Sequence, residues 1–194
     1  QLAEAIRAKH PNAKTILVGG TVRDALIGIP NTDIDIEIGG VLIGDIEQIA
    51  IELFPEPIET VGRAFGILKI LHRGDDGILY DIDIAIPRRD SKVAVGHTGF
   101  EVVGDLNLTF EDAARRRDFT MNAMGVDVAS GELLDPFGGE RDLMARTLRA
   151  VDLNTFRDDP LRVYRALQLV ARFELVPDHD TLECLVSMVA GGEL

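Results

Sequence analysis

Two pairs of aspartates have the spacing expected of a metal site. Asp33 and Asp35 form one pair and Asp81 and Asp83 the other, each within a stretch that alternates acid and isoleucine. On a β-strand, residues two apart point to the same face, so the members of a pair lie roughly 7 Å apart along the backbone. Carboxylates on one face repel each other unless a cation lies between them, and their hard oxygen atoms suit Mg²⁺.

The interpretation of these pairs depends on whether their strands are neighbours. A single acid-x-acid pair is also typical of a solvated polar face, which needs no cation. If the two strands lie side by side, three or four carboxylates converge. That is the arrangement of two-metal phosphoryl transfer, in which one ion activates a hydroxyl and the other stabilises the leaving pyrophosphate. Convergence therefore favours a metal site.

A glycine pair, Gly19-Gly20, precedes the first acidic strand and joins a predicted strand over 15–18 to a predicted helix over 21–27. Glycines at such a junction let backbone N–H groups approach phosphate oxygens at a helix N-terminus, and Arg23 could contact the same triphosphate. The spacing is not G-x-G-x-x-G, and the lysine of a Walker motif is absent. Taken alone, such a pair more often forms just a tight turn.

The remaining patterns predict an α/β front followed by a helical back. We expect further helices over 1–10 and 45–54, strands over 33–38, 66–72 and 79–86, and a mobile loop over 88–108. Thr109 and Asp112 have the spacing of a helix capping box, and the helix that follows is expected to carry the cluster at 115–118. A hairpin turning at Ser130-Gly131 and helices over 160–173 and 181–190 complete the prediction.

The net charge of −13 disfavours a nucleic-acid partner, but the cations are unevenly distributed. Between residues 115 and 172 there are ten arginines and no lysine. Arginine suits forked contacts with phosphate groups and base edges, so this stretch indicates a local polyanion site. A set of ion pairs on helix surfaces explains the same composition, and composition leaves both interpretations open.

Four motifs in order resemble those of class II tRNA nucleotidyltransferases and bacterial poly(A) polymerases. Residues 18–26 (VGGTVRDAL) with 33–36 (DIDI) resemble the first motif of the family. Residues 111–112 (ED) with 116–123 (RRDFTMNA) resemble its ribose-selecting motif, 135–139 (DPFGG) with 142–143 and 148–149 its hinge motif, and 158–165 (DDPLRVYR) its base-reading helix. The resemblance covers about residues 16–173.

The resemblance implies a fold, a reaction and the partners of that reaction. The fold is α/β (α+β), with a polymerase-beta-like nucleotidyltransferase head built on a mixed sheet over 1–140 and a helical neck over 141–194. The reaction is the addition of CMP and AMP, from CTP and ATP, to the 3′ end of tRNA, with release of pyrophosphate and with Mg²⁺ as cofactor. The segment 88–108 corresponds to a loop that helps relatives to switch from C to A addition.

The resemblance also implies the residues that carry the reaction. The catalytic acids are Asp33, Asp35 and Asp81, of which Asp33 and Asp35 bind the metal. The nucleotide is bound by Gly19, Gly20, Arg23, Arg117, Asp118, Asp159, Arg162 and Arg165. Among these, Arg117 with Asp118 recognises the sugar, and Asp159 with Arg162 reads the incoming base in place of a template.

The chain departs from the family pattern in three ways. Asp158 stands where the family usually has glutamate, and Gln168-Leu169 stands where many members have Arg-Phe. The chain also stops before most of the helical body and tail that hold tRNA in relatives. A poly(A) polymerase shares every motif quoted, and a nucleotide- or RNA-binding module without catalysis is an alternative of another class. Both remain open.

The setting expected from the sequence is cytoplasmic. No apolar run approaches the length of a membrane span, and no membrane partner is expected. Cys184 is the only cysteine, which excludes an internal disulfide. The oligomeric state is left undetermined.

Overall fold

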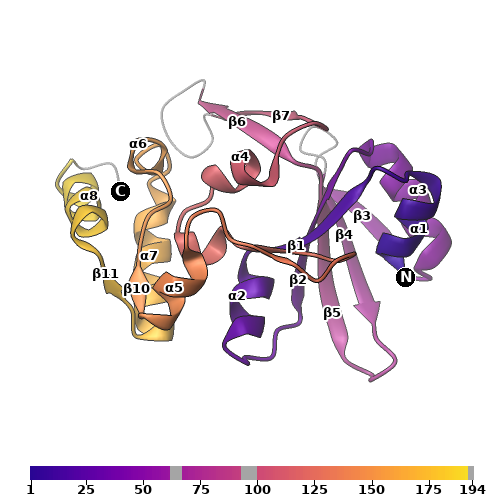
Figure 1. Ribbon diagram of the computed structural model, residues 1–194, viewed down its shortest axis with the longest axis horizontal. Coiled ribbons are helices and arrows are strands. Elements are labelled where there is room, and N and C mark those ends of the chain that lie inside the picture. Colours follow the sequence, from indigo (N-terminus) through magenta and orange to yellow (C-terminus); the bar gives the residue numbers. More distant parts are fainter. Residues whose placement is uncertain (62–66, 93–99, 192–194) are drawn as a thin grey trace.

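The computed structural model describes residues 1–61, 67–92 and 100–191, and its centre is a seven-stranded mixed sheet (Figure 1). In spatial order the strands are β3 (Ile58–Val61), β4 (Ile67–Arg73), β5 (Leu79–Ala85), β2 (Asp33–Gly39), β1 (Lys14–Val18), β8 (Gly125–Asp127) and β9 (Leu133–Leu134). β2 and β5 pair in parallel, and the other pairs are antiparallel. The expected mixed-sheet α/β fold is confirmed.

Helices surround the sheet and then continue alone toward the C-terminus. They are α1 (Leu2–Lys9), α2 (Gly20–Leu26), α3 (Ile43–Leu53), α4 (Phe110–Arg115), the 3-10 helix η1 (Thr120–Asn122), α5 (Gly139–Met144), α6 (Leu153–Phe156), α7 (Leu161–Phe173) and α8 (His179–Ala190). α1 and α3 lie at one end of the molecule, and α6, α7 and α8 lie at the other (Figure 1). None of the described helices combines the length and the apolarity needed to cross a membrane.

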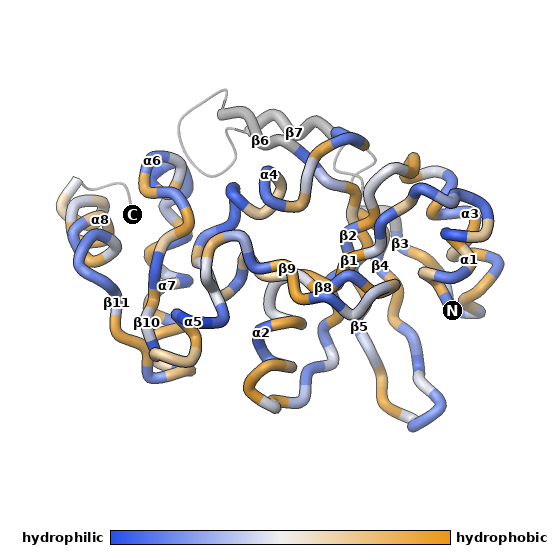
Figure 2. Tube along the Cα trace, in the orientation of Figure 1, coloured by the Kyte–Doolittle hydropathy of each residue, from blue (hydrophilic) through white to orange (hydrophobic). Residues whose placement is uncertain are grey.

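The first hydrophobic core lies between the sheet and helices α1 and α3. Figure 2 colours the trace by hydropathy. Along β2 and β5 acids alternate with isoleucines, so isoleucines occupy one face of these strands and acids the other. Ile38 and Ile84 pack there with Ile6 of α1 and with Ile46 and Ile49 of α3. Burial of the isoleucine face therefore fixes the direction in which the acids point.

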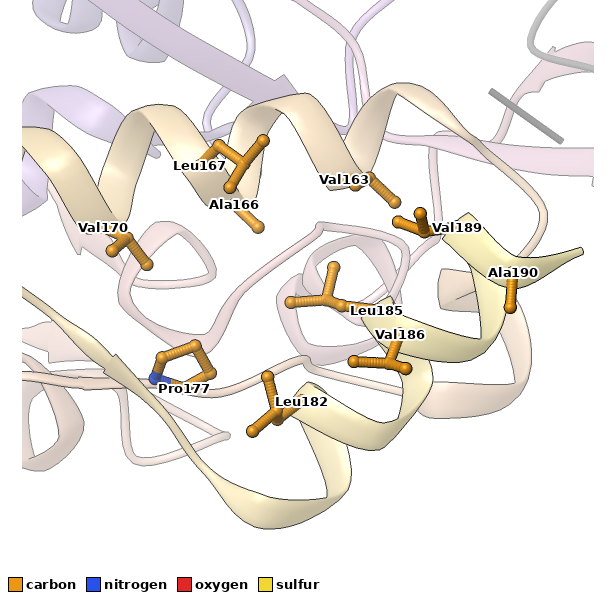
Figure 3. A pocket seen from close by; sticks show the side chains of 10 residues that line it. All are labelled: Val163, Ala166, Leu167, Val170, Pro177, Leu182, Leu185, Val186, Val189 and Ala190. Atoms are coloured by element: carbon orange, nitrogen blue, oxygen red, sulfur yellow. The ribbon is translucent and has the colours of Figure 1, made fainter. Parts of the chain in front are cut away.

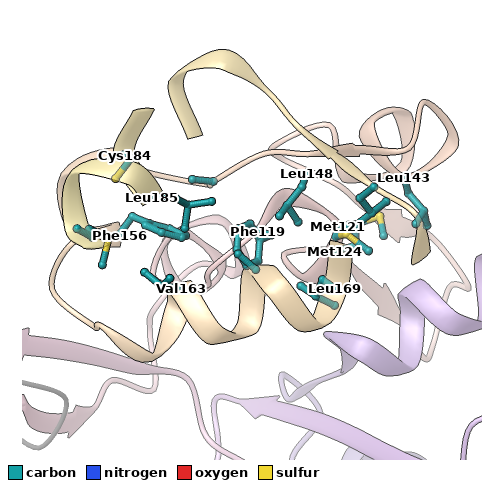
Figure 4. Close-up of a cluster of buried hydrophobic side chains, with 14 of the residues drawn as sticks. Phe119, Met121, Met124, Leu143, Leu148, Phe156, Val163, Leu169, Cys184 and Leu185 are labelled. Atoms are coloured by element: carbon teal, nitrogen blue, oxygen red, sulfur yellow. The ribbon is translucent and has the colours of Figure 1, made fainter. Parts of the chain in front are cut away.

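The second core joins the head to the helical part (Figure 4). Phe119 packs edge-on against Phe156, with ring centroids 5.3 Å apart, and Met121, Leu148 and Leu185 belong to the same cluster. The expected boundary between residues 140 and 141 falls inside α5, and this core contains residues from both sides of it. The helical part is thus anchored to the head by shared apolar packing.

Residues 135–139 (DPFGG) form the N-terminal cap of α5. The carboxylate of Asp135 accepts the backbone N–H groups of Gly139 (2.6 Å) and Glu140 (3.0 Å), which supplies acceptors for two free donors of the first turn. A side chain at Gly139 would overlap the carbonyl oxygen of Thr120, and Gly138 has a φ of +72°. Gly139 is therefore required by the close packing of α5 on η1, and Gly138 by its left-handed backbone conformation.

The structure corrects two expectations about local structure. The segment 88–108 was expected to be a loop, but β6 (Arg88–Lys92) and β7 (Phe100–Gly104) pair in it as an antiparallel ladder, while residues 93–99 lie outside the described part. Helix α4 is capped by Thr109 as expected but ends at Arg115, so it does not carry the whole cluster at 115–118. A second small ladder, β10 (Thr147–Leu148) with β11 (Val176–Pro177), is parallel.

An apolar groove with a volume of about 460 Å³ runs between α7 and α8 (Figure 3). Val163 and Ala166 of α7 face Leu185 of α8 at its base, whereas Leu167 and Val186 on its rim are 63% and 60% exposed. This surface lies away from the acidic face of the sheet.

Candidate active site

The parallel pairing of β2 with β5 brings the two aspartate pairs together. In the register of these strands Asp33 lies opposite Asp81 and Asp35 lies opposite Asp83. Neighbouring strands are about 4.8 Å apart, so the four carboxylates share one face, which we call the acid face. The predicted condition for convergence, that the two strands are neighbours, is confirmed.

Asp35 is the aspartate of the acid face whose charged form is disfavoured by its surroundings. Burial raises the pKa of Asp35 above its ordinary value, and the neighbouring carboxylates of Asp83 and Asp33 raise it further. Arg117 and Lys69 act in the opposite direction without restoring the ordinary value. Ionised Asp35 is therefore incompletely compensated by protein charges, which is the condition under which a carboxylate gains by binding a cation.

The acid face offers carboxylate pairs and no ready-made cage. Among residues 1–61, 67–92 and 100–191, no group of three His, Cys, Asp or Glu side chains is arranged to hold a metal ion. Mg²⁺ commonly binds through one or two carboxylates and completes its shell with water and substrate phosphates. Asp33 and Asp35 supply that kind of donor set.

A lysine that the sequence analysis did not single out lies on the acid face. The ammonium group of Lys69 on β4 donates to Asp83 Oδ1 at 2.6 Å and lies 3.8 Å from Asp81 Oδ1. The hydrogen bond to Asp83 raises the pKa of Lys69. Asp81, the expected third acid, lies opposite Asp33, just as Asp83 lies opposite Asp35, and the role of Asp81 stays a prediction.

The glycine turn is built against the acid face. Gly19 has a φ of +67°, and a Cβ there would lie 3.0 Å from Nη1 of Arg117 and 3.3 Å from Oδ2 of Asp35. The hydroxyl of Thr21 donates to the carbonyl oxygen of Asp33 at 3.1 Å and accepts the N–H of Asp35 at 2.9 Å. The N-terminus of α2 is therefore tied to the strand that carries the acids.

Arg23 is engaged inside the protein. Its side chain is 6% exposed, its Nε donates to Asp24 Oδ1 at 2.7 Å, and its Nη1 donates to Asn122 Oδ1 at 2.6 Å. Its guanidinium carbon lies 4.6 Å from the centre of the Phe173 ring. These contacts place Arg23 between head and neck, and its contact with a triphosphate remains a prediction. Gly20, which begins the same helix, lies beside the Arg23 guanidinium.

Arg23 is part of a chain of polar contacts that reaches α7. Asp118 accepts from Asn122 Nδ2 at 3.0 Å through Oδ1 and from Arg165 Nε at 2.6 Å through Oδ2. At the other end, Arg172 lies 3.3 Å from Asp24. We call Arg23, Asp24, Asp118, Asn122, Arg165 and Arg172 the interface network. It occupies Asp118 and Arg165, both expected to contact the nucleotide, in contacts within the protein.

Arg117 lies between the acid face and the interface network. Burial lowers the pKa of Arg117 and the neighbouring Arg116 lowers it further, whereas Glu37 and Asp35 favour its charged form. Its Nη1 donates to the carbonyl oxygen of Asn122 at 3.4 Å. Its position beside Gly19 and Asp35 is compatible with the expected contact to a nucleotide.

Asp159 and Arg162 lie at the start of α7. The helix begins at Leu161, so Asp159 precedes it, and the Asp159 carboxylate accepts the N–H of Leu161 at 3.0 Å. Arg162 Nη2 donates to the carbonyl oxygen of Arg116 at 2.6 Å, and its guanidinium carbon lies 5.4 Å from the centre of the Phe156 ring. Asp159 lies near enough to Arg162 to favour its charged form, and the role of the two side chains in base recognition stays a prediction.

Most arginines between residues 115 and 172 are paired with acids. The pairs are Arg115 with Glu111, Arg141 with Asp142, Arg146 with Glu174, Arg149 with Asp142 and Asp178, Arg165 with Asp118, and Arg172 with Asp24. Ion pairing therefore explains much of the arginine enrichment, in agreement with the interpretation of these arginines as a set of ion pairs on helix surfaces.

Known proteins resemble the chain in both sequence and structure. Residues 15–149 match the family described as the poly A polymerase head domain. The chain belongs to this family. The resemblance to class II tRNA nucleotidyltransferases and poly(A) polymerases is thereby confirmed.

Individual relatives extend beyond the family domain. The Multifunctional CCA protein of Neisseria gonorrhoeae (strain NCCP11945) is 37% identical over 180 residues, which cover 93% of this chain and 40% of the relative. A CCA-adding enzyme solved in complex with CTP has a TM-score of 0.76 at 31% identity and matches 95% of this chain and 41% of its own. The Thermotoga maritima CCA-adding enzyme complexed with tRNA has a TM-score of 0.76 at 29% identity, over 99% and 42% of the two chains. This chain spans about two fifths of the length of its curated relatives.

Several residues of the family domain escaped the sequence analysis for an identifiable reason. Asn122 and Asp24 lie within recognised motifs, but only the packing of η1 against α2 shows that they are joined through Arg23. Lys69 was detectable as a polar position in the alternating strand β4, yet its partner Asp83 lies 14 residues away on the next strand. Such pairs depend on the register between neighbouring strands, which cannot be read directly from the sequence.

Proposed function

We propose that this chain is the nucleotidyl-transferring part of a tRNA CCA-adding enzyme, which adds CMP and AMP from CTP and ATP to the 3′ end of tRNA and releases pyrophosphate. The observation that carries the proposal is the acid face, set directly beside the Gly19-Gly20 turn and Arg117. The solved relatives in complex with CTP and with tRNA support the choice of substrates.

The acid face suits Mg²⁺, and family membership favours a requirement for a divalent metal. Asp33 and Asp35 provide hard carboxylate oxygens on one strand face, and Asp35 is incompletely compensated by protein charge. Bound there, Mg²⁺ would supply Lewis-acid activation of the 3′-hydroxyl and the α-phosphate. Asp81, opposite Asp33, and Asp83, opposite Asp35, complete the set of acids in this proposal.

The protein groups around the acid face would position the two reactants. The backbone of Gly19 and Gly20 lies at the N-terminus of α2, where N–H groups and the helix dipole favour the phosphates of the nucleotide. Arg117 would neutralise charge on the phosphates or hold the sugar, close to Asp35. The hydroxyl oxygen forms a bond to the α-phosphorus while the bond to the β-phosphate oxygen breaks.

Base selection is proposed for Asp159 and Arg162. A side-chain carboxylate and a guanidinium offer an acceptor and several donors, which together can distinguish base edges by hydrogen bonding. An unmatched base would leave one of these groups without its partner at a cost of roughly 1–3 kcal/mol. Sugar recognition is proposed for Arg117 and Asp118, and a further nucleotide contact for Arg165 and Arg23.

The test is incorporation by the 194-residue chain itself. A tRNA lacking its 3′ CCA is incubated with Mg²⁺ and CTP, ATP or both, and the products are sized while pyrophosphate is measured. We expect two additions with CTP alone and a third when ATP is also present. Asp35→Asn is the matched control that removes one charge and keeps the size of the side chain.

The other outcomes have distinct meanings. A long tail made from ATP alone would identify a poly(A) polymerase and overturn CCA addition. Nucleotide binding without any incorporation, in wild type and Asp35→Asn alike, would indicate a binding module. Equal incorporation by wild type and Asp35→Asn would contradict the assignment of the acid face.

A further inference from the structure

Lys69 is the basic side chain that β4 contributes to the acid face. β4 pairs with β5 so that Lys69 lies directly opposite Asp83, which in turn lies opposite Asp35 on β2. The ammonium group is 2.6 Å from Asp83 Oδ1 and 3.8 Å from Asp81 Oδ1. The order across three strands is therefore cation, carboxylate, carboxylate.

The surroundings of Lys69 differ from those of an ordinary surface lysine. Lys9 forms a pair of similar length with Glu52 at 2.7 Å, but those two groups are 50% and 63% exposed and join two helices. Lys69 and Asp83 are 38% and 34% exposed, and Asp35 and Asp81 lie within their electrostatic reach. A charge in such a cluster acts on several carboxylates together.

The acid face has more negatively charged groups than positively charged groups near it. Asp33, Asp35, Asp81 and Asp83 carry four negative charges when ionised, and the cations that act on Asp35 are Arg117 and Lys69. Glu59 of β3 lies opposite Lys69 on its other side, yet the ammonium group binds Asp83. Lys69 thus offsets charge at the Asp81–Asp83 side and leaves Asp33 and Asp35 to the metal.

We propose that Lys69 is a positioning residue of the active site: its ammonium group holds Asp83 beside Asp35 and limits the affinity of the acid face for divalent cations. This inference rests on the proposed function and adds to it a residue that acts through Asp83. Removing the ammonium group makes the face more negative, so a divalent cation binds more tightly. It also frees the Asp83 carboxylate, so catalysis slows.

The opposite signs of these two effects separate positioning from general damage. In Lys69→Met, we expect the dissociation constant for Mn²⁺ to fall about fivefold at low salt. It is measured without nucleotide, from the electron paramagnetic resonance signal of free Mn²⁺. The turnover at saturating Mg²⁺ is expected to fall about tenfold or more, since misplacing a reacting group is costly. A misfolded or loosened acid face would instead weaken Mn²⁺ binding together with turnover.

Further variants complete the design. Lys69→Arg keeps the charge and is expected to hold the Mn²⁺ affinity within about twofold of wild type. Lys9→Met removes the matched surface pair and should change neither quantity. In an Asp83→Asn background, Lys69→Met should cause little further loss of turnover, because its partner is already gone. Circular dichroism checks folding, and Lys69→Gln replaces Lys69→Met if that variant does not fold.

The outcomes separate this inference from the proposed function. If the wild-type chain binds Mn²⁺ no better than an Asp33→Asn/Asp35→Asn variant, the acid face is not a cation site and both proposals fail. If wild type shows that site but Lys69→Met binds Mn²⁺ with equal or weaker affinity, only the role of Lys69 is overturned. Full turnover in Lys69→Met would overturn it as well.

Discussion

The acid face and the interface network use the same residue types in opposite ways. In the network, Asp24 is 2% exposed and has partners in Arg23, Asn31 and Arg172. On the acid face, Asp35 lies among other carboxylates, and its pKa is raised by burial and by them. Charges that serve architecture lie beside groups of opposite charge, whereas charges without such compensation on a rigid strand are available to a ligand.

This difference has an energetic basis. A buried ion pair is costly to break, because removing one partner leaves the other charged and without water, at roughly 3–5 kcal/mol. Repulsion between like charges on a half-exposed face lowers the free energy of unfolding, and a bound cation raises it again. The two regions should therefore respond in opposite ways when a carboxylate is neutralised.

The largest expected effect is on activity at the acid face. Asp35→Asn should lower nucleotide incorporation by at least about a thousandfold, because metal ions supply several kcal/mol of transition-state stabilisation. The free energy of unfolding without metal should stay equal or rise, since a repulsive charge is removed. Single-turnover incorporation and urea unfolding measure the two. A variant retaining a tenth of the activity would contradict the comparison.

The next largest effect is on stability in the interface network. Asp24→Asn leaves Arg23 and Arg172 without a counter-charge and should lower the free energy of unfolding by about 3 kcal/mol. Urea unfolding beside Asp35→Asn shows the contrast directly. Equal stability of the two variants would mean that the network is not the stabilising element that its contacts indicate.

A smaller loss of stability is expected where the network reaches solvent. The side chain of Arg165 is 55% exposed, so Arg165→Met should cost about 1 kcal/mol, because solvent screens its pair with buried Asp118. A double-mutant cycle with Asp118→Asn isolates the coupling between the two side chains. Additive effects would show that Arg165 and Asp118 stabilise the protein independently.

The smallest expected effect lies outside both regions and depends on pH. Hydrogen bonds from the backbone N–H of Ser130 and then of Ala129 lower the pKa of Asp127, against a smaller opposing effect of burial. Its stabilisation is present above the ordinary aspartate pKa and is lost as pH falls through the lowered value. Asp127→Ala should therefore cost about 0.5–1.5 kcal/mol at neutral pH and less in acid. A loss that is constant with pH would contradict this assignment.

The sequence predicted the elements better than the contacts between them. Alternation of acid and isoleucine predicted β2 and β5, and the Thr109 cap located the start of α4, because both signals are local. The prediction of a loop over 88–108 was wrong because the two strands of its ladder show no alternation of polar and apolar residues. At the site, the pairing of Asp35 with Asp83 depends on strand register, and the contact of Arg23 with Asn122 depends on the packing of η1 against α2. No local pattern specifies either.

The parallel pairing of β2 with β5 also has a consequence for how the chain folds. Partners such as Asp35 and Asp83 are separated by 48 residues (83 − 35), whereas the β4–β5 hairpin pairs neighbours in the chain. Closing the longer loop lowers the entropy of the chain before any stabilising contact has formed. We therefore expect β2 and β5 to pair late in folding. Four like charges meet only at that step, and salt screens their repulsion. Refolding should therefore accelerate with ionic strength, and a chain still emerging from the ribosome acquires its acid face only after β5 has been made.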